Sequence, residues 1–490
     1  MGGVGAQYPL LYRHKCSWGD VTRSAECASS RAGSRRAQCW RRSIWGSIYS
    51  HVMSNGRVSA AFGGTADGGV GIGFEKFTIS RTASQQSAGC GRFGGRMRIA
   101  ISGVGIAGPA LAYWLVEGGH DVFLVEQAPK LRDGGYLVDF WGLGFDIIEK
   151  MGLVPKVMER GYQVRDVRYV DDRGRKRGGF QVEIFRDLTS GRFTSLRRSD
   201  LSAILYGALE GRVETLFDES IAAIHRDTQR LQVHFERSPP REVDLVIGAD
   251  GLHSRVRALA FDESDEVPLG YHVAAFEIEG YRPREELVFV SYSLPGRQIS
   301  RFSMRGDRTL FLFVFRDEYL GGMTPRNAEE QKQALKKAFT GGAWECEKIF
   351  EAMAQAGEIY FDRVSQIRMN AWSNERVALV GDAAACVSLL AGEGTGLAIA
   401  EAYVLAGELN RCEGDYARAF SNYQRLMMPF IARKQRAAEK FATSFAPRTK
   451  FGIAFRNLVT SMLRIRPVMH FFIGRSLRDD IRLPDYEAKT

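Results

Sequence analysis

Three glycines at a fixed spacing follow the first strongly apolar run of the sequence. The run Met97–Ser102 predicts a buried β-strand, and it leads into Gly103-x-Gly105-x-x-Gly108. In a strand–turn–helix unit, Gly103 would permit a tight turn and Gly105 would let backbone N–H groups approach a pyrophosphate. Gly108 would let the following helix lie close to the strand. The helix N-terminus adds unpaired N–H groups and a positive dipole end, so the stretch predicts phosphate binding.

An acidic residue stands where such a unit needs one. The predicted helix ends at Gly118-Gly119, and a second apolar run, Val122–Val125, ends in Glu126, 18 residues after Gly108. A carboxylate at the tip of the second strand can accept hydrogen bonds from both ribose hydroxyls. A lone glycine motif would be weak evidence, but strand, turn, helix, strand and acid together predict a site for an ADP-containing dinucleotide. Arg132, in the next polar loop, either reaches a phosphate or is a solvated loop arginine.

Two further buried strands end in glycine and aspartate. Val243–Ile247 runs into Asp250-Gly251, and the strand Arg376–Val380 runs into Gly381-Asp382. Open α/β sheets place ligand contacts at the carboxyl ends of their strands. Asp382 is therefore predicted to bind a cofactor rather than merely to cap a helix, whereas Asp250 as a simple turn residue stays an alternative.

A second glycine-rich loop repeats the logic of the first. Gly392, Gly394 and Gly396 precede a predicted helix over about 397–409, whose N-terminal N–H groups would face an electron-rich partner. His253 and His272 are also candidates for acid–base chemistry, although a lone histidine is more often a structural residue.

Composition excludes several classes of function. Hydrophobic residues are 45% and charged residues 25% of the 490, which is typical of an ordinary globular protein. Residues 1–96 carry 13 Lys and Arg against four acids, so they hold 13 − 4 = +9 of the net charge of +10 and leave +1 for residues 97–490. A nucleic-acid surface is therefore not expected.

The cysteines and the apolar runs bear on metal binding, the cellular compartment and membrane insertion. Only Cys346, Cys386 and Cys412 lie beyond residue 96, and no Cys or His spacing suggests a metal site. This pattern fits a reducing compartment, so a cytoplasmic location is expected. No apolar run reaches the roughly 18 residues of a membrane span.

Pattern changes along the chain divide it into segments. Residues 1–96 are rich in Gly, Ser, Ala and Arg without periodicity, and are expected to be a disordered or spurious leader, with a transit peptide as the alternative. Residues 97–261 are expected to form the first part of the dinucleotide-binding domain, with strands at 164–170 and 180–185 forming a hairpin that joins the substrate domain. Residues 262–365 predict that substrate domain, whose strands one helix at about Ala328–Ala338 interrupts. Residues 366–430 predict the second part of the first domain, and 431–490 the C-terminal helices.

Taken in order, the three motifs resemble the FAD-dependent group A aromatic-hydroxylase family, whose relatives include the tetracycline-inactivating monooxygenases. The resemblance covers roughly residues 97–430. It implies that the first motif holds the ADP half of FAD, that Asp382 binds the ribityl hydroxyls, and that Asp250-Gly251 lies near the pyrophosphate and serves FAD and NAD(P)H. Arg198, in Arg-x-Asp-Leu, would be a further cofactor contact.

The chain departs from the family pattern in two places. Ala385 stands where a histidine is usual, and Leu389 stands where a proline usually packs beside the reactive edge of the flavin. Neither departure removes a predicted cofactor contact.

The resemblance also implies a fold and an activity. The expected fold is α/β, with a Rossmann-like FAD-binding domain, an inserted and mainly antiparallel β-sheet substrate domain, and a C-terminal helical segment. The expected enzyme is a monooxygenase in which NAD(P)H reduces FAD and O2 forms a flavin C4a-hydroperoxide. One oxygen atom then passes to an aromatic or polyketide-like small molecule held over the inserted sheet.

Other functions stay open. One is a reductase or dehydrogenase of the same fold that inserts no oxygen, and another is a non-catalytic FAD-binding sensor, which Ala385 and Leu389 keep open. A halogenase is disfavoured because its Trp-x-Trp-x-Ile-Pro signature is missing. The expected partners are a small organic substrate and O2, in a monomer or homodimer. The basic C-terminal helices are expected to brace the two domains rather than to touch a membrane.

Overall fold

A six-stranded sheet contains the first predicted strand at its centre. In the computed structural model, which describes residues 95–227, 229–261, 265–463 and 479–487, β1 lies between β11 and β2. Every pair is parallel except β17 with β18. The predicted leader lies outside the described residues apart from Gly95 and Arg96. The strands, in sheet order, are β17 (Ser373–Asn374), β18 (Val377–Leu379), β11 (Leu245–Gly248), β1 (Arg98–Ser102), β2 (Asp121–Glu126) and β7 (Glu214–Phe217).

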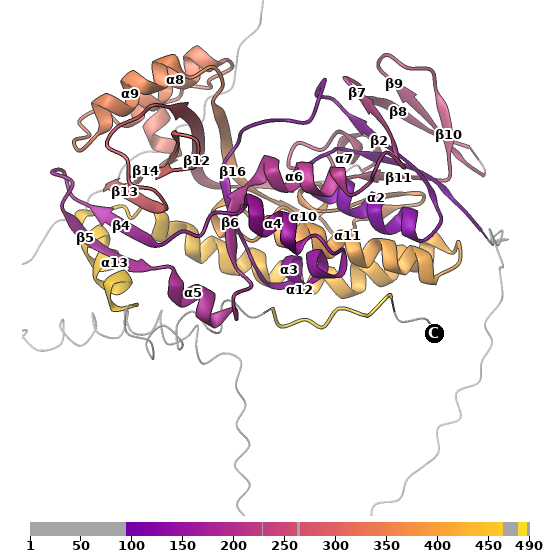
Figure 1. Ribbon diagram of the computed structural model, residues 1–490. Helices are drawn as coiled ribbons and strands as arrows, with labels where there is room; N and C mark the ends of the chain where they lie inside the picture. Colours follow the sequence, from indigo (N-terminus) through magenta and orange to yellow (C-terminus); the bar gives the residue numbers. More distant parts are fainter. Residues whose placement is uncertain (1–94, 228, 262–264, 464–478, 488–490) are drawn as a thin grey trace, which may run out of the picture. The chain divides into compact units, whose positions relative to one another are not determined.

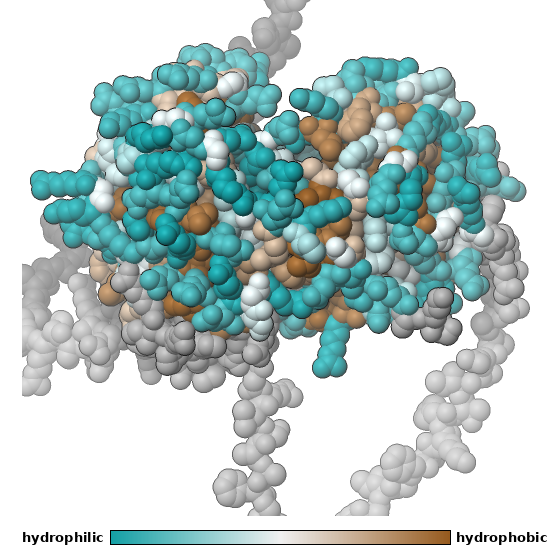
Figure 2. All heavy atoms as spheres, in the orientation of Figure 1, coloured by the Kyte–Doolittle hydropathy of each residue, from teal (hydrophilic) through white to brown (hydrophobic). Residues whose placement is uncertain are grey.

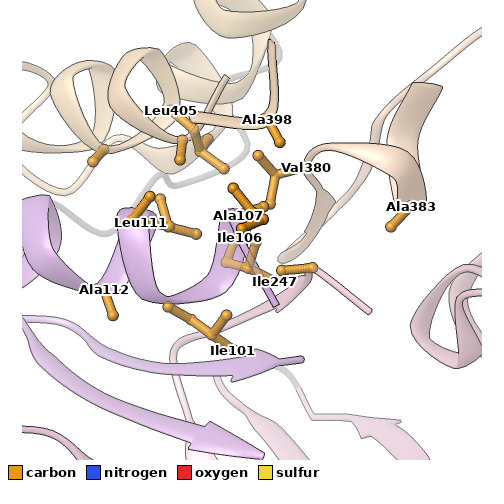
Figure 3. Packing of buried hydrophobic residues seen from close by; sticks show 14 of the residues in the cluster. Ile101, Ile106, Ala107, Leu111, Ala112, Ile247, Val380, Ala383, Ala398 and Leu405 are labelled. Atoms are coloured by element: carbon orange, nitrogen blue, oxygen red, sulfur yellow. The ribbon is translucent and has the colours of Figure 1, made fainter. Parts of the chain in front are cut away.

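Two helices pack tightly on this sheet through small residues. α2 (Ala107–Glu117) and α11 (Gly394–Arg411) lie against each other. In Figure 3, Ala107, Val380 and Ala398 point toward one another where the start of α2, the end of the β18 strand region and the start of α11 meet. Short side chains let these backbones approach closely, which brings three separate stretches of the sequence to one place.

A second, seven-stranded sheet is mainly antiparallel, as predicted. Its only parallel pair among the described strands is β4 with β13. The strands, in sheet order, are β16 (Tyr360–Arg368), β12 (Asp265–Glu279), β15 (Arg308–Arg316), β14 (Arg297–Ser303), β13 (Val288–Leu294), β4 (Asp166–Val170) and β5 (Lys176–Gln181).

The predicted strand at 180–185 is wrong beyond residue 181. β5 pairs with β4 only as far as Gln181, and α5 (Glu183–Leu188) follows at once. The N–H of Val182 still bonds to the carbonyl of Arg165, but the N–H of Phe185 bonds to the carbonyl of Val182, which starts a helical turn. The helical turn therefore begins inside the segment that was predicted to be a strand.

Two helices cover one face of the seven-stranded sheet. α8 (Ala328–Ala338) matches its prediction, whereas α9 (Cys346–Gln355) was not predicted. Buried side chains of the sheet, such as Phe313, pack against Leu335 and Ile349 of these helices. The outer faces are hydrophilic, as the teal surface over α8 and α9 shows in Figure 2.

The remaining elements connect these layers (Figure 1). They form two small sheets, β3 with β6 and β8 to β10, together with short helices. Their bounds are β3 (Leu137–Phe140), α3 (Gly142–Lys150), α4 (Val154–Arg160), β6 (Thr194–Arg197), α6 (Arg198–Gly207), β8 (Ile221–Arg226), β9 (Leu231–Phe235), β10 (Arg241–Val243), α7 (Arg255–Ala260), η1 (Asp317–Leu320), α10 (Asp382–Ala385) and η2 (Leu389–Ala391).

Two C-terminal helices follow the second glycine loop. α12 (Tyr416–Phe445) contains the predicted boundary at residue 430, and α13 (Lys450–Met462) packs on β5. A Cβ at Gly178 of β5 would lie 2.7 Å from the carbonyl oxygen of Asn457, so the contact requires glycine there. In the part of the chain that the structure describes, no helix has the length and hydropathy of a membrane span.

The packing under α8 and α9 gives a direct test of this fold. Phe313 is fully buried and contacts the rings of Phe276, Phe339 and Phe350. We expect Phe313→Ala to lower the free energy of unfolding by about 3–5 kcal/mol, because it leaves a cavity in a packed core. The matched control is Phe451→Ala on α13, where the ring is 74% exposed and the change should stay within about 0.5 kcal/mol. Similar losses for the two variants in urea unfolding would contradict the packing.

Candidate cofactor-binding site

The first glycine turn lies at the carboxyl end of β1, against the Asp250 loop. Gly103 has φ +105° and donates its N–H to the carbonyl of Val125 at 2.7 Å. A Cβ at Gly103 would lie 2.5 Å from the carbonyl oxygen of Ala249, and one at Gly108 would lie 1.9 Å from the carbonyl oxygen of Gly103. The close approaches expected of Gly103 and Gly108 are therefore present.

Glu126 is held at the mouth of this turn by backbone donors. Its Oε2 accepts the N–H of Val104 at 2.9 Å, and its Oε1 accepts the N–H of Ala128 at 2.9 Å. Each oxygen keeps a second acceptor site, which is what ribose hydroxyls require. Arg132 lies 3.6 Å from Glu126 with its side chain 65% exposed, which fits the solvated alternative better than a fixed phosphate contact.

Arg198 and Gly105 frame a space of the right chemistry for a phosphate. Arg198 is the first residue of α6, and its N–H bonds to the carbonyl of Tyr136. Within the described residues, its guanidinium forms no ion pair. Its Nη2 lies 3.3 Å from where a Cβ of Gly105 would stand. A glycine backbone facing an uncompensated guanidinium fits the pyrophosphate of a dinucleotide.

Gly381 and Asp382 join the same region from the β18 side. Gly381 has φ +65°, and a Cβ on it would lie 3.2 Å from Cβ of Ala107 and 3.3 Å from Cβ of Ala398. Asp382 begins α10, and its Oδ1 is 3.7 Å from where a Cβ of Gly394 would stand. Burial raises the pKa of Asp382, and the positive charge of Arg198 opposes that rise. The structure thus brings the three predicted motifs together.

The carboxylate of Asp250 accepts most of its hydrogen bonds from its own loop. It accepts the hydroxyl of Ser254 and the backbone N–H groups of Arg255 at 2.8 Å and Val256 at 3.1 Å. These bonds cap α7, although burial still raises the pKa of Asp250. The turn alternative is therefore well supported by geometry, and a direct contact of Asp250 with a cofactor stays a prediction.

Two tyrosines that the sequence analysis did not single out lie next to this site. The rings of Tyr136 and Tyr360 are 5.3 Å apart, and both phenols interact electrostatically with Arg198 and Asp382. Burial raises the pKa of Tyr136 to about 12 and raises that of Tyr360 as well, so both are neutral phenols at pH 7. Tyr360 begins β16, and the pair therefore joins the seven-stranded sheet to the cofactor region.

The two departures from the family pattern occupy packed positions. Ala385 is buried in the core of the first domain. Leu389 begins η2 and packs against a cluster that includes Tyr271 and Val273 of β12. The segment between Gly381 and Gly392 therefore packs against the seven-stranded sheet through the side chain of Leu389.

The candidate histidines both pair with aspartates. His253 lies 3.2 Å from Asp362, and this pairing raises the pKa of the 64% exposed His253 side chain. His272 lies 2.8 Å from Asp317 and stacks on Phe315, and its burial lowers its pKa. His272 therefore has the contacts of a satisfied core residue.

Glu401 was missed, although its sequence carried a signal. It is an acidic residue inside the apolar helix α11, and it is 1% exposed. Its Oε2 accepts the N–H of Gly381 at 2.8 Å and the hydroxyl of Tyr423 at 3.0 Å. Burial raises the pKa of Glu401 to about 8. Glu401 thus fixes the Gly381 turn from behind.

Comparisons with known proteins agree with this geometry. The model of the FAD binding domain family matches residues 96–419. A flavin-dependent monooxygenase of an unknown prokaryotic organism is 31% identical over 398 residues, covering 80% of this chain and 99% of that protein. An uncharacterized Mycobacterium tuberculosis protein, MT1298, is 38% identical over 350 residues, covering 69% of this chain and 91% of that protein. The crystal structure of tetracycline destructase Tet(51) matches with a TM-score of 0.69 and 33% identity, covering 80% of this chain and 100% of that one. The predictions of an α/β fold and of FAD as cofactor are confirmed.

The buried Glu401 predicts how stability depends on pH. Its folded pKa of about 8 exceeds its ordinary value of 4.5, so the folded state holds a proton that the unfolded state releases between these values. Stability should therefore fall as pH rises from about 5 to 8. We expect Glu401→Gln to flatten that fall by up to about 1.4 kcal/mol per pH unit in urea unfolding.

A conservative control separates this effect from a general loss of charge. Glu347→Gln changes an exposed carboxylate on α9 and should leave the pH slope unchanged. A wild-type slope in Glu401→Gln would show that Glu401 is ionised in the folded protein, contrary to the expected proton.

Proposed function

This chain belongs to the FAD binding domain family that includes flavin-dependent monooxygenases, and we propose that it hydroxylates an aromatic or polyketide-like small molecule with NAD(P)H and O2. It is an FAD-dependent oxidoreductase. The observation that carries the proposal is the convergence of the Gly103 turn, Arg198 and Asp382 at one place. An enzyme that only bound an ADP-containing dinucleotide would not need the Asp382 loop.

The residues present fit FAD along its length. The Gly103–Gly108 turn and Arg198 would hold the pyrophosphate, and Glu126 would hold the ribose. Asp382 would bind the ribityl hydroxyls. The loop containing Gly392 and Gly394, at the N-terminus of α11, would face the pyrimidine end of the flavin.

The chemistry then divides between cofactor and chain. When bound, FAD would supply the redox chemistry between NAD(P)H and O2. The chain orients the ring and the substrate and keeps water away from them. The proposed reaction requires no protein nucleophile, and burial raises the pKa of the Cys386 thiol, which lies beside Asp382.

One buried aromatic cluster joins the two domains beside the proposed site. It combines Phe302 and Leu310 of the seven-stranded sheet with Phe193 of the first domain, and Tyr136 and Trp141 pack against it. Tyr136 and Trp141 are only partly buried, so a flat apolar ring of a substrate would contact these two side chains. The likeness to a protein named tetracycline destructase supports tetracycline as the first compound to test.

Two alternatives use the same cofactor. A reductase or dehydrogenase would oxidise NAD(P)H without inserting oxygen, and a sensor would bind FAD without turnover. Ala385 and Leu389, which differ from the family pattern, are the features that favour testing for these outcomes.

A single set of assays distinguishes the three. We expect purified protein to be yellow, to oxidise NADH or NADPH faster when substrate is added, and to yield a product 16 Da heavier, as one oxygen atom requires. The substrates are tetracycline and a panel of aromatic compounds. A colourless protein that FAD cannot reconstitute would contradict the cofactor site. Bound flavin without stimulated oxidation would favour the sensor, and oxidation without the heavier product would favour the reductase.

Arg198 provides a sharper test of the pyrophosphate contact. A hydrogen bond to a charged group contributes about 1.5–3 kcal/mol, so Arg198→Met should weaken FAD binding by roughly 10- to 150-fold. Quenching of flavin fluorescence measures the dissociation constant. Arg132→Met is the control, because a 65% exposed arginine is screened and its loss should change binding less than about threefold. Equal constants for wild type and Arg198→Met would remove Arg198 from the site.

A further inference from the structure

One lysine links the second glycine loop to the C-terminal end of the chain. Nζ of Lys434, on α12, lies 2.9 Å from Oε2 of Glu393 and 2.9 Å from Oδ1 of Asp479. Their side chains are 14%, 21% and 15% exposed, so solvent screens these pairs only weakly. Glu393 stands between Gly392 and Gly394, directly before α11. The ion pairs therefore act on the loop that the proposed flavin site uses.

Asp479 also caps a second helix at the same place. Its Oδ2 accepts the N–H of Leu143 at 3.0 Å, whereas Trp141, which precedes α3, offers no side-chain cap. A carboxylate at a helix N-terminus satisfies a free N–H and complements the dipole. α3 meets α11 there, since a Cβ at Gly144 would lie 2.5 Å from Cα of Gly396. Asp479 thus ties the starts of α3 and α11 together.

The segment that carries Asp479 is itself well anchored. It runs alongside α3 and α12 in Figure 1. The hydroxyl of Tyr486 donates to Glu408 of α11 at 2.6 Å, and the Tyr486 ring occupies the space where a Cβ of Gly407 would stand. Lys150 of α3 pairs with Asp485 at 3.2 Å. Asp479 is therefore held at its position from both neighbouring helices.

The two carboxylates, Glu393 and Asp479, border an opening beside the glycine loop. A cavity there is lined by Asp139, Trp141, Gly144, Glu393, Gly396 and Asp479. A carboxylate in this loop disfavours negative charge nearby, and reduction of a flavin adds negative charge. Burial raises the pKa of Glu393, and Lys434 opposes that rise by offsetting the carboxylate charge. Lys434 is the cation that both carboxylates share.

We propose that Lys434 and Asp479 are positioning residues for the flavin: they fix the Gly392–Gly396 loop, and Lys434 neutralises Glu393 so that the loop tolerates a reduced ring. The inference rests on the proposed function, because it takes this loop to be a flavin contact. It assigns the C-terminal segment 479–487 a part in cofactor binding.

The midpoint potential of the bound flavin tests the electrostatic half. We expect Lys434→Met to weaken the hold on reduced flavin about tenfold relative to oxidised flavin, which is a shift of about −30 mV for a two-electron couple. The double variant Glu393→Gln/Lys434→Met removes the carboxylate as well and should return the potential toward the wild-type value. Lys434→Arg keeps the charge and should also keep the potential. A merely structural lysine would not be rescued by removing Glu393.

FAD affinity tests the positional half. Asp479→Asn keeps the Lys434–Glu393 pair but weakens the anchor, and should raise the FAD dissociation constant about tenfold. Asp480→Asn is the matched control, because the neighbouring Asp480 side chain is 71% exposed and pairs with Arg433 at 3.2 Å, away from Lys434. It should bind FAD as the wild type does. Circular dichroism checks that each variant is folded. If Lys434→Met does not fold, Glu393→Gln alone tests the electrostatic half, because removing this carboxylate should raise the potential, and Asp479→Asn tests the positional half.

The possible outcomes distinguish a failure of this inference from a failure of the proposed function. If wild type binds no flavin, the proposed function fails. If wild type binds flavin and Lys434→Met and Asp479→Asn match it in potential and affinity, the function stands and the inference is overturned. If Lys434→Met lowers the potential and the double variant Glu393→Gln/Lys434→Met does not restore it, the electrostatic part is also overturned.

Discussion

The close approach of backbones at the carboxyl end of the parallel sheet is the constraint on which the rest depends. Gly103 lies against the carbonyl of Ala249, and Gly381 lies between Ala107 and Ala398. A side chain at either glycine would collide with these neighbours or strain a positive φ. The two motifs can therefore meet at one place only because each contributes a bare backbone there. Arg198 and Asp382 gain their mutual electrostatic interaction from that geometry rather than from their own packing.

The site is also a place where buried charge is left incompletely compensated. The partly buried Arg198 forms no ion pair within the described residues, and burial raises the pKa of Asp382. Each of these is costly in an apolar interior. A bound dinucleotide would bring phosphate charge to Arg198 and hydroxyl donors to Asp382, so these costs would be recovered on binding. Glu401 differs, because it is satisfied by Gly381 and Tyr423 and its role is to shape the turn.

Features formed by residues close together in the sequence could be predicted, whereas contacts between residues far apart in the sequence could not. The Gly103–Glu126 unit, the strand ends before Asp250 and Asp382, and α8 all follow from spacing over a few residues. Tyr360, Lys434 and Asp479 reach the site from segments whose own patterns carry no sign of it, because their contacts span up to 336 residues. Residues 183–185 of α5 were predicted as strand, because residue types alone do not reveal the turn that the N–H of Phe185 closes on the carbonyl of Val182. Glu401 is the exception, since an acid inside an apolar helix is a visible signal.

Leu389 shows how the glycine loop is held without the proline that the family pattern has there. A proline restricts the unfolded chain and so makes a loop less costly to order. Leu389 lacks that restriction, but it packs against Tyr271 and Val273, and Ser388 accepts the N–H of Leu390 at 3.2 Å. At the other end of the loop, Lys434 holds Glu393. The loop is thus fixed by contacts to β12 and α12 rather than by its own backbone, and its position depends on elements that join both domains. The proposed flavin site and the packing of the inserted sheet therefore share the residues between Leu389 and Glu393.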